Sequence, residues 1–136
     1  MQEIATHLST LGSFAAFFLA ALALMALFVL VYTWLTPWDE FSLIRAGNNA
    51  AALSFAGALL GFVLPLSSAI AHSAGLLDMV VWGVVALIVQ VLAFLLARLL
   101  DADLRRRIEA GETATAGKLG VLALSVGILN AACMTY

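Results

Sequence analysis

Charged side chains are scarce in this sequence: Asp, Glu, Lys and Arg make up 10% of its 136 residues, against roughly 25% in ordinary soluble domains. Hydrophobic residues make up 65% of the chain, and its mean hydropathy is +1.12. A soluble domain of this size cannot hide so much apolar surface, because small domains bury only about two-thirds of what their unfolded chains expose. The composition excludes an ordinary soluble enzyme, and also a disordered or nucleic-acid-binding protein, since both need charge.

Motifs of known catalytic chemistry are also missing. The sequence contains no Gly-rich phosphate loop, no CxxC pair and no HExxH pattern, which are spacings that bind phosphates or metal ions. His7, His72, Glu3 and Asp78 are expected near one membrane surface, but they lack the spacing of a metal site. We therefore expect no enzyme activity, no cofactor and no metal ion.

Four stretches contain no Asp, Glu, Lys or Arg: 4–38, 46–77, 79–97 and 119–136. Each has at least 18 residues, close to the ~20 that cross a hydrocarbon layer about 30 Å thick. The pattern predicts an all-α integral membrane protein, one membrane domain over 1–136, in contact with the lipid bilayer. The predicted spans are about 12–35, 50–71, 77–98 and 114–134. The apolar run Leu11–Leu35 is too long for a signal peptide, so the first span is expected to be retained.

The basic residues predict the orientation. Arg45 follows the first span, and the others surround the link between the third and fourth spans: Arg98, Arg105, Arg106, Arg107 and Lys118. The positive-inside rule places such links in the cytoplasm, so both termini are expected outside it. Aromatic residues are expected at the two interfaces, namely Tyr32, Trp34 and Trp38 on the inner side and Trp82 and Tyr136 on the outer side.

The two basic links resemble each other. Ile44–Ala52 aligns with Ile108–Ala116 at an offset of 64, with five of nine positions identical. The chain is therefore predicted to be two parallel two-helix repeats, about 12–71 and 77–134, in a four-helix bundle. Such repeats are related by an axis along the membrane normal.

Each link is expected to hold a short helix that ends at Gly47 or Gly111, because glycine adopts the left-handed conformation without strain. An ordinary glycine-containing loop is the alternative. The first short helix is expected to be capped by Thr36, and the second by Asp101 or Asp103. The second span is expected to be capped by Asn48 or Asn49, and the fourth by Thr113.

Small and polar residues within the spans are candidate packing or binding positions. Gly57 and Gly61 share one face of the second span, which lets helix backbones approach closely, either inside one chain or in a homo-oligomer. The other candidates are Pro65, Ser67, Ser68, Gln90 and Asn130. Pro65 and Asn130 have similar expected depths, so these groups are expected either to join helices by hydrogen bonds or to line a solute site.

Basic residues in the links are candidate contacts for a cytoplasmic partner, namely Arg45, Arg105, Arg106 and Arg107. Juxtamembrane basic residues gain about 1 kcal/mol each from anionic lipid head groups. Contact with lipid alone is therefore the alternative explanation.

Two stretches, Arg45–Ala69 and Gly127–Tyr136, resemble the bacterial YjfL-type inner-membrane proteins, catalogued as domain of unknown function 350; Thr36–Glu40 fits less specifically. The resemblance covers the whole chain and implies a four-span architecture in the bacterial inner membrane. It implies no catalytic residues. Genes for such proteins tend to lie beside those for phage-shock-like membrane-stress proteins, which implies a role in envelope maintenance by association.

Three functions follow from these observations. The first is a non-enzymatic membrane protein that acts through partners, including a cytoplasmic membrane-stress protein. The alternative is a small channel or transporter for an ion or small solute, assembled as a homo-oligomer. An enzyme acting on lipid is the third, but its best polar pair, His72 and Asp78, does not share a helical turn.

Overall fold

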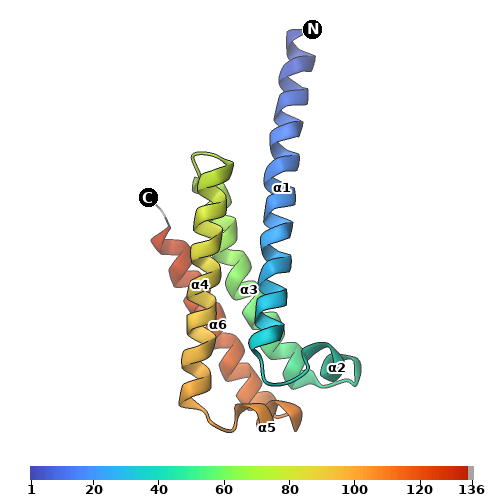
Figure 1. The fold of residues 1–136 in the computed structure, drawn as a ribbon, viewed down its shortest axis with the longest axis vertical. Helices are drawn as coiled ribbons and strands as arrows, with labels where there is room; N and C mark the ends of the chain where they lie inside the picture. The colour runs from blue at the N-terminus through green and yellow to red at the C-terminus, as the bar shows by residue number, and fades with distance from the viewer. Residues whose placement is uncertain (135–136) are drawn as a thin grey trace.

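The computed structural model describes residues 1–134, so the predicted interfacial position of Tyr136 lies outside the described residues. Within this range the chain is all-helical (Figure 1). The helices are α1 (Gln2–Leu35), α2 (Glu40–Arg45), α3 (Asn49–His72), α4 (Leu76–Leu100), α5 (Leu104–Glu109) and α6 (Thr113–Cys133). The prediction of an all-α fold is confirmed.

Four of these helices, α1, α3, α4 and α6, are long and apolar enough to cross a membrane. The last three match the predicted spans to within two residues. Helix α1 begins ten residues before the predicted first span. In its polar first turns the hydroxyl groups of Thr6 and Thr10 each donate to the carbonyl four residues earlier, at 2.9 Å.

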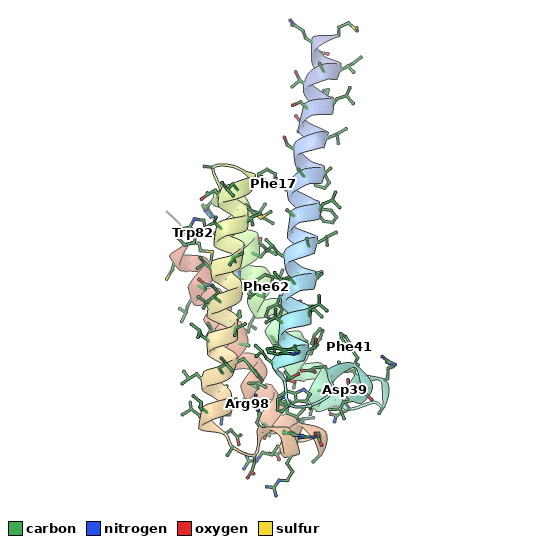
Figure 2. All side chains as sticks on the ribbon, in the orientation of Figure 1. Phe17, Asp39, Phe41, Phe62, Trp82 and Arg98 are labelled. Carbon is green, nitrogen blue, oxygen red and sulfur yellow. The ribbon has the colours of Figure 1, made fainter. Side chains whose placement is uncertain are left out.

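Helices α3 and α6 make the most extensive helix contact in the bundle. Both run away from the end that carries α2 and α5, and α4 packs against both of them (Figure 1). Helix α1 packs against α3 and α4. Phe17 lies near the level of the α3–α4 turn (Figure 2), so the first part of α1 extends beyond the other helices.

Glycines bring the backbones of α3 and α6 into direct contact. A Cβ atom on Gly57 would lie 2.6 Å from the Gly120 carbonyl oxygen, and one on Gly127 would lie 2.6 Å from the Gly61 Cα. The structure therefore places Gly57 and Gly61 in a contact inside one chain. Such close approach increases dispersion contact between helices that no hydrophobic effect drives together in lipid.

The two short helices have matching ends. Helices α2 and α5 begin 64 residues apart and end 64 residues apart. Gly47 (φ +85°) and Gly111 (φ +79°) follow them in the left-handed conformation. In each case the next N–H reaches back to a carbonyl in the helix: Asn48 N to Leu43 O at 2.9 Å, and Glu112 N to Arg107 O at 3.0 Å. The predicted glycine stops are confirmed, and they turn the chain sharply into α3 and α6.

Two predicted caps are wrong. Thr36 does not begin α2; it ends α1, its N–H donates to the Tyr32 carbonyl at 3.0 Å, and the following proline cannot continue that helix. The cap of α2 is Asp39, whose side chain accepts from Ser42 N at 3.3 Å. Glu112 precedes α6, so Thr113 is the first helical residue rather than its cap.

Asn48 joins the two short-helix regions. Its Oδ1 accepts from Ala51 N at 3.1 Å and caps α3, while its Nδ2 donates to the Ile108 carbonyl at the end of α5, at 2.9 Å. One amide side chain therefore satisfies groups at two helix ends that are far apart in sequence.

Substitution Asn48→Ala is expected to destabilise the detergent-solubilised protein by about 2 kcal/mol, because a cap and a further hydrogen bond are each worth about 1 kcal/mol. Asn48→Asp keeps the cap and loses only the donation, so we expect about half the effect. Thermal unfolding measures both. The control is Asn49→Ala, at an exposed neighbouring position; equal losses for Asn48→Ala and Asn49→Ala would contradict this role.

Candidate functional site

The candidate residues near the far ends of α3 and α6 point in different directions and do not form one polar cluster. Pro65 is buried, Ser67 is exposed, and the Ser68 hydroxyl donates to the Ala131 carbonyl of α6 at 3.0 Å. The Nδ2 atom of Asn130 is buried and has no hydrogen-bond partner among residues 1–134. Ser68 therefore links α3 to α6, whereas Ser67 faces away from this contact.

Gln90 joins three helices near the middle of the bundle. Its side chain is buried on α4, and its Nε2 donates to the Ala123 carbonyl of α6 at 3.1 Å. The same nitrogen would lie 2.6 Å from a Cβ on Gly61 of α3. The Gln90 amide thus fits beside α3 because Gly61 has no side chain.

The histidine and acidic residues of the far end make separate local bonds. His72 Nδ1 lies 3.0 Å from the Ser68 carbonyl oxygen, and Asp78 Oδ2 accepts from Ala74 N at 2.9 Å. Among the residues that the structure describes, no three His, Cys, Asp or Glu side chains gather as metal ligands.

Glu40 is buried beside other polar groups, and the sequence analysis did not identify it. It is the first residue of α2 and its side chain is only 1% exposed. It lies beside Tyr32 at the end of α1 and Trp38 in the α1–α2 turn, and Tyr32 in turn lies beside Ser54 of α3. We call Tyr32, Trp38, Glu40 and Ser54 the Glu40 cluster. Figure 2 shows the neighbouring Asp39 and Phe41 at this end of the molecule.

Two aromatic residues of this cluster correct a sequence prediction. Tyr32 and Trp38, expected at the membrane interface, are buried in the protein. Only Trp34, which is 82% exposed, remains on the surface at this end of α1. The ring of Phe94 on α4 packs edge-on against Tyr32 and Trp38, with centroids 5.4 and 6.1 Å apart. Aromatic packing against α4 therefore holds these rings inside.

The Glu40 carboxyl lies beside two donor groups, the Tyr32 hydroxyl and the Trp38 indole nitrogen, but makes no well-formed hydrogen bond to either. Neither of its oxygens has a hydrogen-bond partner within residues 1–134, and the same holds for the Tyr32 hydroxyl and the Trp38 indole nitrogen. Burial raises the pKa of Glu40 from 4.5 to about 7; the polar groups of Trp38 and Tyr32 oppose this rise, and the charge of Asp39 adds to it. A carboxyl with such a pKa exchanges its proton near neutral pH, and buried groups of this kind concentrate at functional sites.

A cavity of about 140 Å³ adjoins the Glu40 cluster. Tyr32 and Ser54 belong to its wall, and so do Gln90 and Phe94 of α4. The rest of the wall is Phe28 of α1 together with aliphatic side chains of α3, α4 and α6. Pockets with an apolar wall, a few polar groups and a perturbed acid nearby are the usual form of binding sites.

The arginines of α5 pair with carboxylates of their own segment. Arg105 contacts Glu109 at 2.8 Å, Arg106 contacts Asp103 at 3.3 Å, and Arg107 contacts Asp101 at 3.5 Å. Arg45 is exposed on α2. The arginine side chains of these pairs are 67%, 78% and 42% exposed, so they remain accessible for other contacts. Exposed ion pairs of this kind contribute little to stability.

The family model described as Domain of Unknown Function (DUF350) matches residues 6–134. The protein named UPF0719 inner membrane protein YjfL, from Escherichia coli strain K12 and from strain O157:H7, is 41% identical over 129 residues, covering 95% of this chain and 98% of the relative. UPF0719 transmembrane protein YshE of Bacillus subtilis strain 168 is 28% identical over 80 residues, covering 59% of this chain and 60% of that protein. No solved structure matches.

The four apolar helices agree with the membrane locations in the names of these relatives, and together they indicate a multi-pass inner-membrane protein. The match to the family model spans nearly the whole described chain, which therefore belongs to the DUF350 family.

Proposed function

We propose that this chain is a non-enzymatic inner-membrane protein that responds to proton uptake at Glu40 and acts through protein partners. The observation that carries the proposal is the buried Glu40 carboxyl, whose two oxygens have no hydrogen-bond partner among the described residues. A buried carboxyl is stable when neutral, but its charged form needs water or a partner, because desolvation of an unpaired charge is costly.

Loss of the proton therefore favours movement of Glu40 toward water. Helix α2 has only six residues and is bounded by the turn at Pro37 and by Gly47. A shift of this short segment would break its contacts with α3, among them the ring contact of Phe41 with Phe55. The same segment exposes Phe41 and Arg45, so a shift of α2 would change the surface that a partner contacts.

The proposal places α2 and α5 on the cytoplasmic side and both termini outside. All six Lys and Arg residues lie toward this end, in α2, α5, the last turn of α4 and the second turn of α6, as the positive-inside rule requires. The matching bounds of α2 and α5 support the further proposal that the halves are parallel repeats. A role in envelope maintenance rests on the family resemblance alone.

Co-purification in mild detergent tests the proposal. We expect the proteins recovered with the parent to differ between pH 6 and pH 8, because Glu40 changes its charge over that interval. Glu40→Gln resembles the neutral carboxyl, so its recovered proteins should match those of the parent at pH 6 at both pH values. The control is Glu3→Gln, at an exposed acid of α1.

An infrared difference spectrum between the two pH values provides a direct readout. The band of a protonated carboxyl should disappear at the higher pH in the parent and be absent from Glu40→Gln. If the parent recovers the same proteins at both pH values, or if no such band titrates, the proposal is wrong.

A second candidate is a transporter for a small solute, formed by a homo-oligomer. The cavity of about 140 Å³ beside the Glu40 cluster supports it, because a protonatable group next to a binding cavity can couple solute movement to protons. Liposomes with a pH gradient measure this flux. An inert result across common ions and small solutes would count against transport and leave the partner-based proposal standing.

A further inference from the structure

A groove between α4 and α6 extends from the middle of the bundle to the basic end. The cavity of about 140 Å³ shares Ala97, Leu100, Leu119 and Leu122 with a second cavity of about 60 Å³. We call the combined space the α4–α6 groove. It extends along α4 from Gln90 to Asp101, about 16 Å at 1.5 Å per residue. This length is about half of a hydrocarbon layer some 30 Å thick, that is, one leaflet.

The groove is apolar and open at its side. Leu96, Leu100 and Leu122 line it and are each about half exposed or more, so its side faces the surroundings of the membrane-spanning helices. Of the polar groups in its wall, Ser54 Oγ donates to Ala51 O at 3.1 Å and Gln90 Nε2 donates to Ala123 O, whereas the Tyr32 hydroxyl has no hydrogen-bond partner within residues 1–134. An apolar cavity of about 150 Å³ is large enough for a benzene-sized group, so the deep part admits a hydrocarbon segment.

The end of the groove near α5 carries one available positive charge. Asp101, Thr115 and Lys118 line it. Asp101 contacts Arg107 at 3.5 Å, whereas exposed Lys118 makes no ion pair within residues 1–134. Thr115 donates to the Glu112 carboxylate at 2.6 Å, so Lys118 is the group at this end that can attract an anion. Lys118 lies at the basic end of the bundle, where lipid head groups would meet the first turns of α6.

We propose that the α4–α6 groove binds one acyl chain of an anionic phospholipid, whose phosphate is held by Lys118. The apolar wall, the open side and the length of one leaflet fit the hydrocarbon chain, and the unpaired lysine fits the head group. This proposal does not depend on the titration of Glu40.

Native mass spectrometry of the purified full chain tests both parts, with phosphatidylglycerol as the anionic lipid and phosphatidylcholine as the zwitterionic one. We expect the parent to retain phosphatidylglycerol preferentially. Lys118→Gln should reduce that preference about five-fold, as the loss of one lysine at a head group predicts. The matched control is Arg45→Gln, at an exposed cation on α2, which should change little.

Filling the groove tests the acyl-chain part. Ala97→Phe should reduce retention of both lipids. Ala97→Leu should reduce it less strongly, and it provides a second test in case the phenylalanine variant does not fold. Ala56→Phe is the control, because Ala56 is exposed on α3 and does not line the groove.

The proposal is overturned if Lys118→Gln keeps the preference of the parent, or if both Ala97 variants retain lipid as Ala56→Phe does. A dimer whose interface covers Leu122 and excludes lipid would assign the groove to a second copy, and would overturn it as well.

Discussion

Substitution Glu40→Gln is expected to stabilise the protein above pH 7 and to remove a loss of stability that the parent shows as pH rises from about 4.5 to 7. The folded-state pKa of Glu40 is raised to about 7 by burial, against 4.5 for an unperturbed carboxyl. Between these values the folded state holds a proton that the unfolded state releases, so stability falls as pH rises. Below pH 4.5 Glu40 is protonated in both the folded and the unfolded state, and its full contribution to stability is present.

The expected size of this effect is about 3 kcal/mol, because one pH unit of difference between folded and unfolded pKa corresponds to about 1.36 kcal/mol. Glutamine has no charge to lose and occupies nearly the same volume, so Glu40→Gln should behave at all pH values as the parent does when protonated. Thermal unfolding of the detergent-solubilised protein at several pH values measures the difference. A parent and variant with parallel pH profiles would contradict it, and exposed Glu3→Gln supplies the control profile.

Substitution Gly127→Ala should destabilise the protein by about 3 kcal/mol, at the upper end of overpacking effects. The added Cβ would lie 2.6 Å from the Gly61 Cα, a separation that real Cβ atoms essentially never show. The atom in the way belongs to the backbone, so a side-chain rotation cannot relieve the clash. Helices α3 and α6 must separate, which weakens the most extensive helix contact in the bundle.

Gly12→Ala is the matched control for this prediction. Gly12 lies in exposed α1, and a Cβ there meets no atom within 4 Å, so its replacement should be neutral or slightly stabilising because alanine is the better helix former. Unfolding in detergent and the elution profile on gel filtration measure both variants. If Gly127→Ala unfolds at the temperature of Gly12→Ala, the direct backbone contact is not important for stability.

The long helices were predictable because the physical cause acts locally. A stretch without charge and about 20 residues long satisfies its own backbone hydrogen bonds only as a helix when it lies in lipid. The three spans after the first therefore match α3, α4 and α6 to within two residues. Gly47 and Gly111 were equally predictable as stops, since the left-handed conformation at a helix end is a property of glycine itself.

The caps were harder to predict. Thr36 and Asp39 are both good capping residues, and the sequence does not show which of them the chain uses. The end of α1 decides, because Thr36 still donates its N–H to that helix and Pro37 then breaks it. The start of α2 is left to Asp39.

The sequence alone determined that this chain lies in a membrane as helices and that short helices end at two glycines, because composition and backbone preference decide both. Only the tertiary structure decided that Asp39 is exposed while the adjacent Glu40 is buried. No local pattern distinguishes two consecutive carboxylates in a surface link. Their difference arises because Glu40 lies beside Tyr32 and Trp38, whose rings pack against Phe55 of α3 and Phe94 of α4. This packing excludes water from Glu40, whereas Asp39 stays in contact with it.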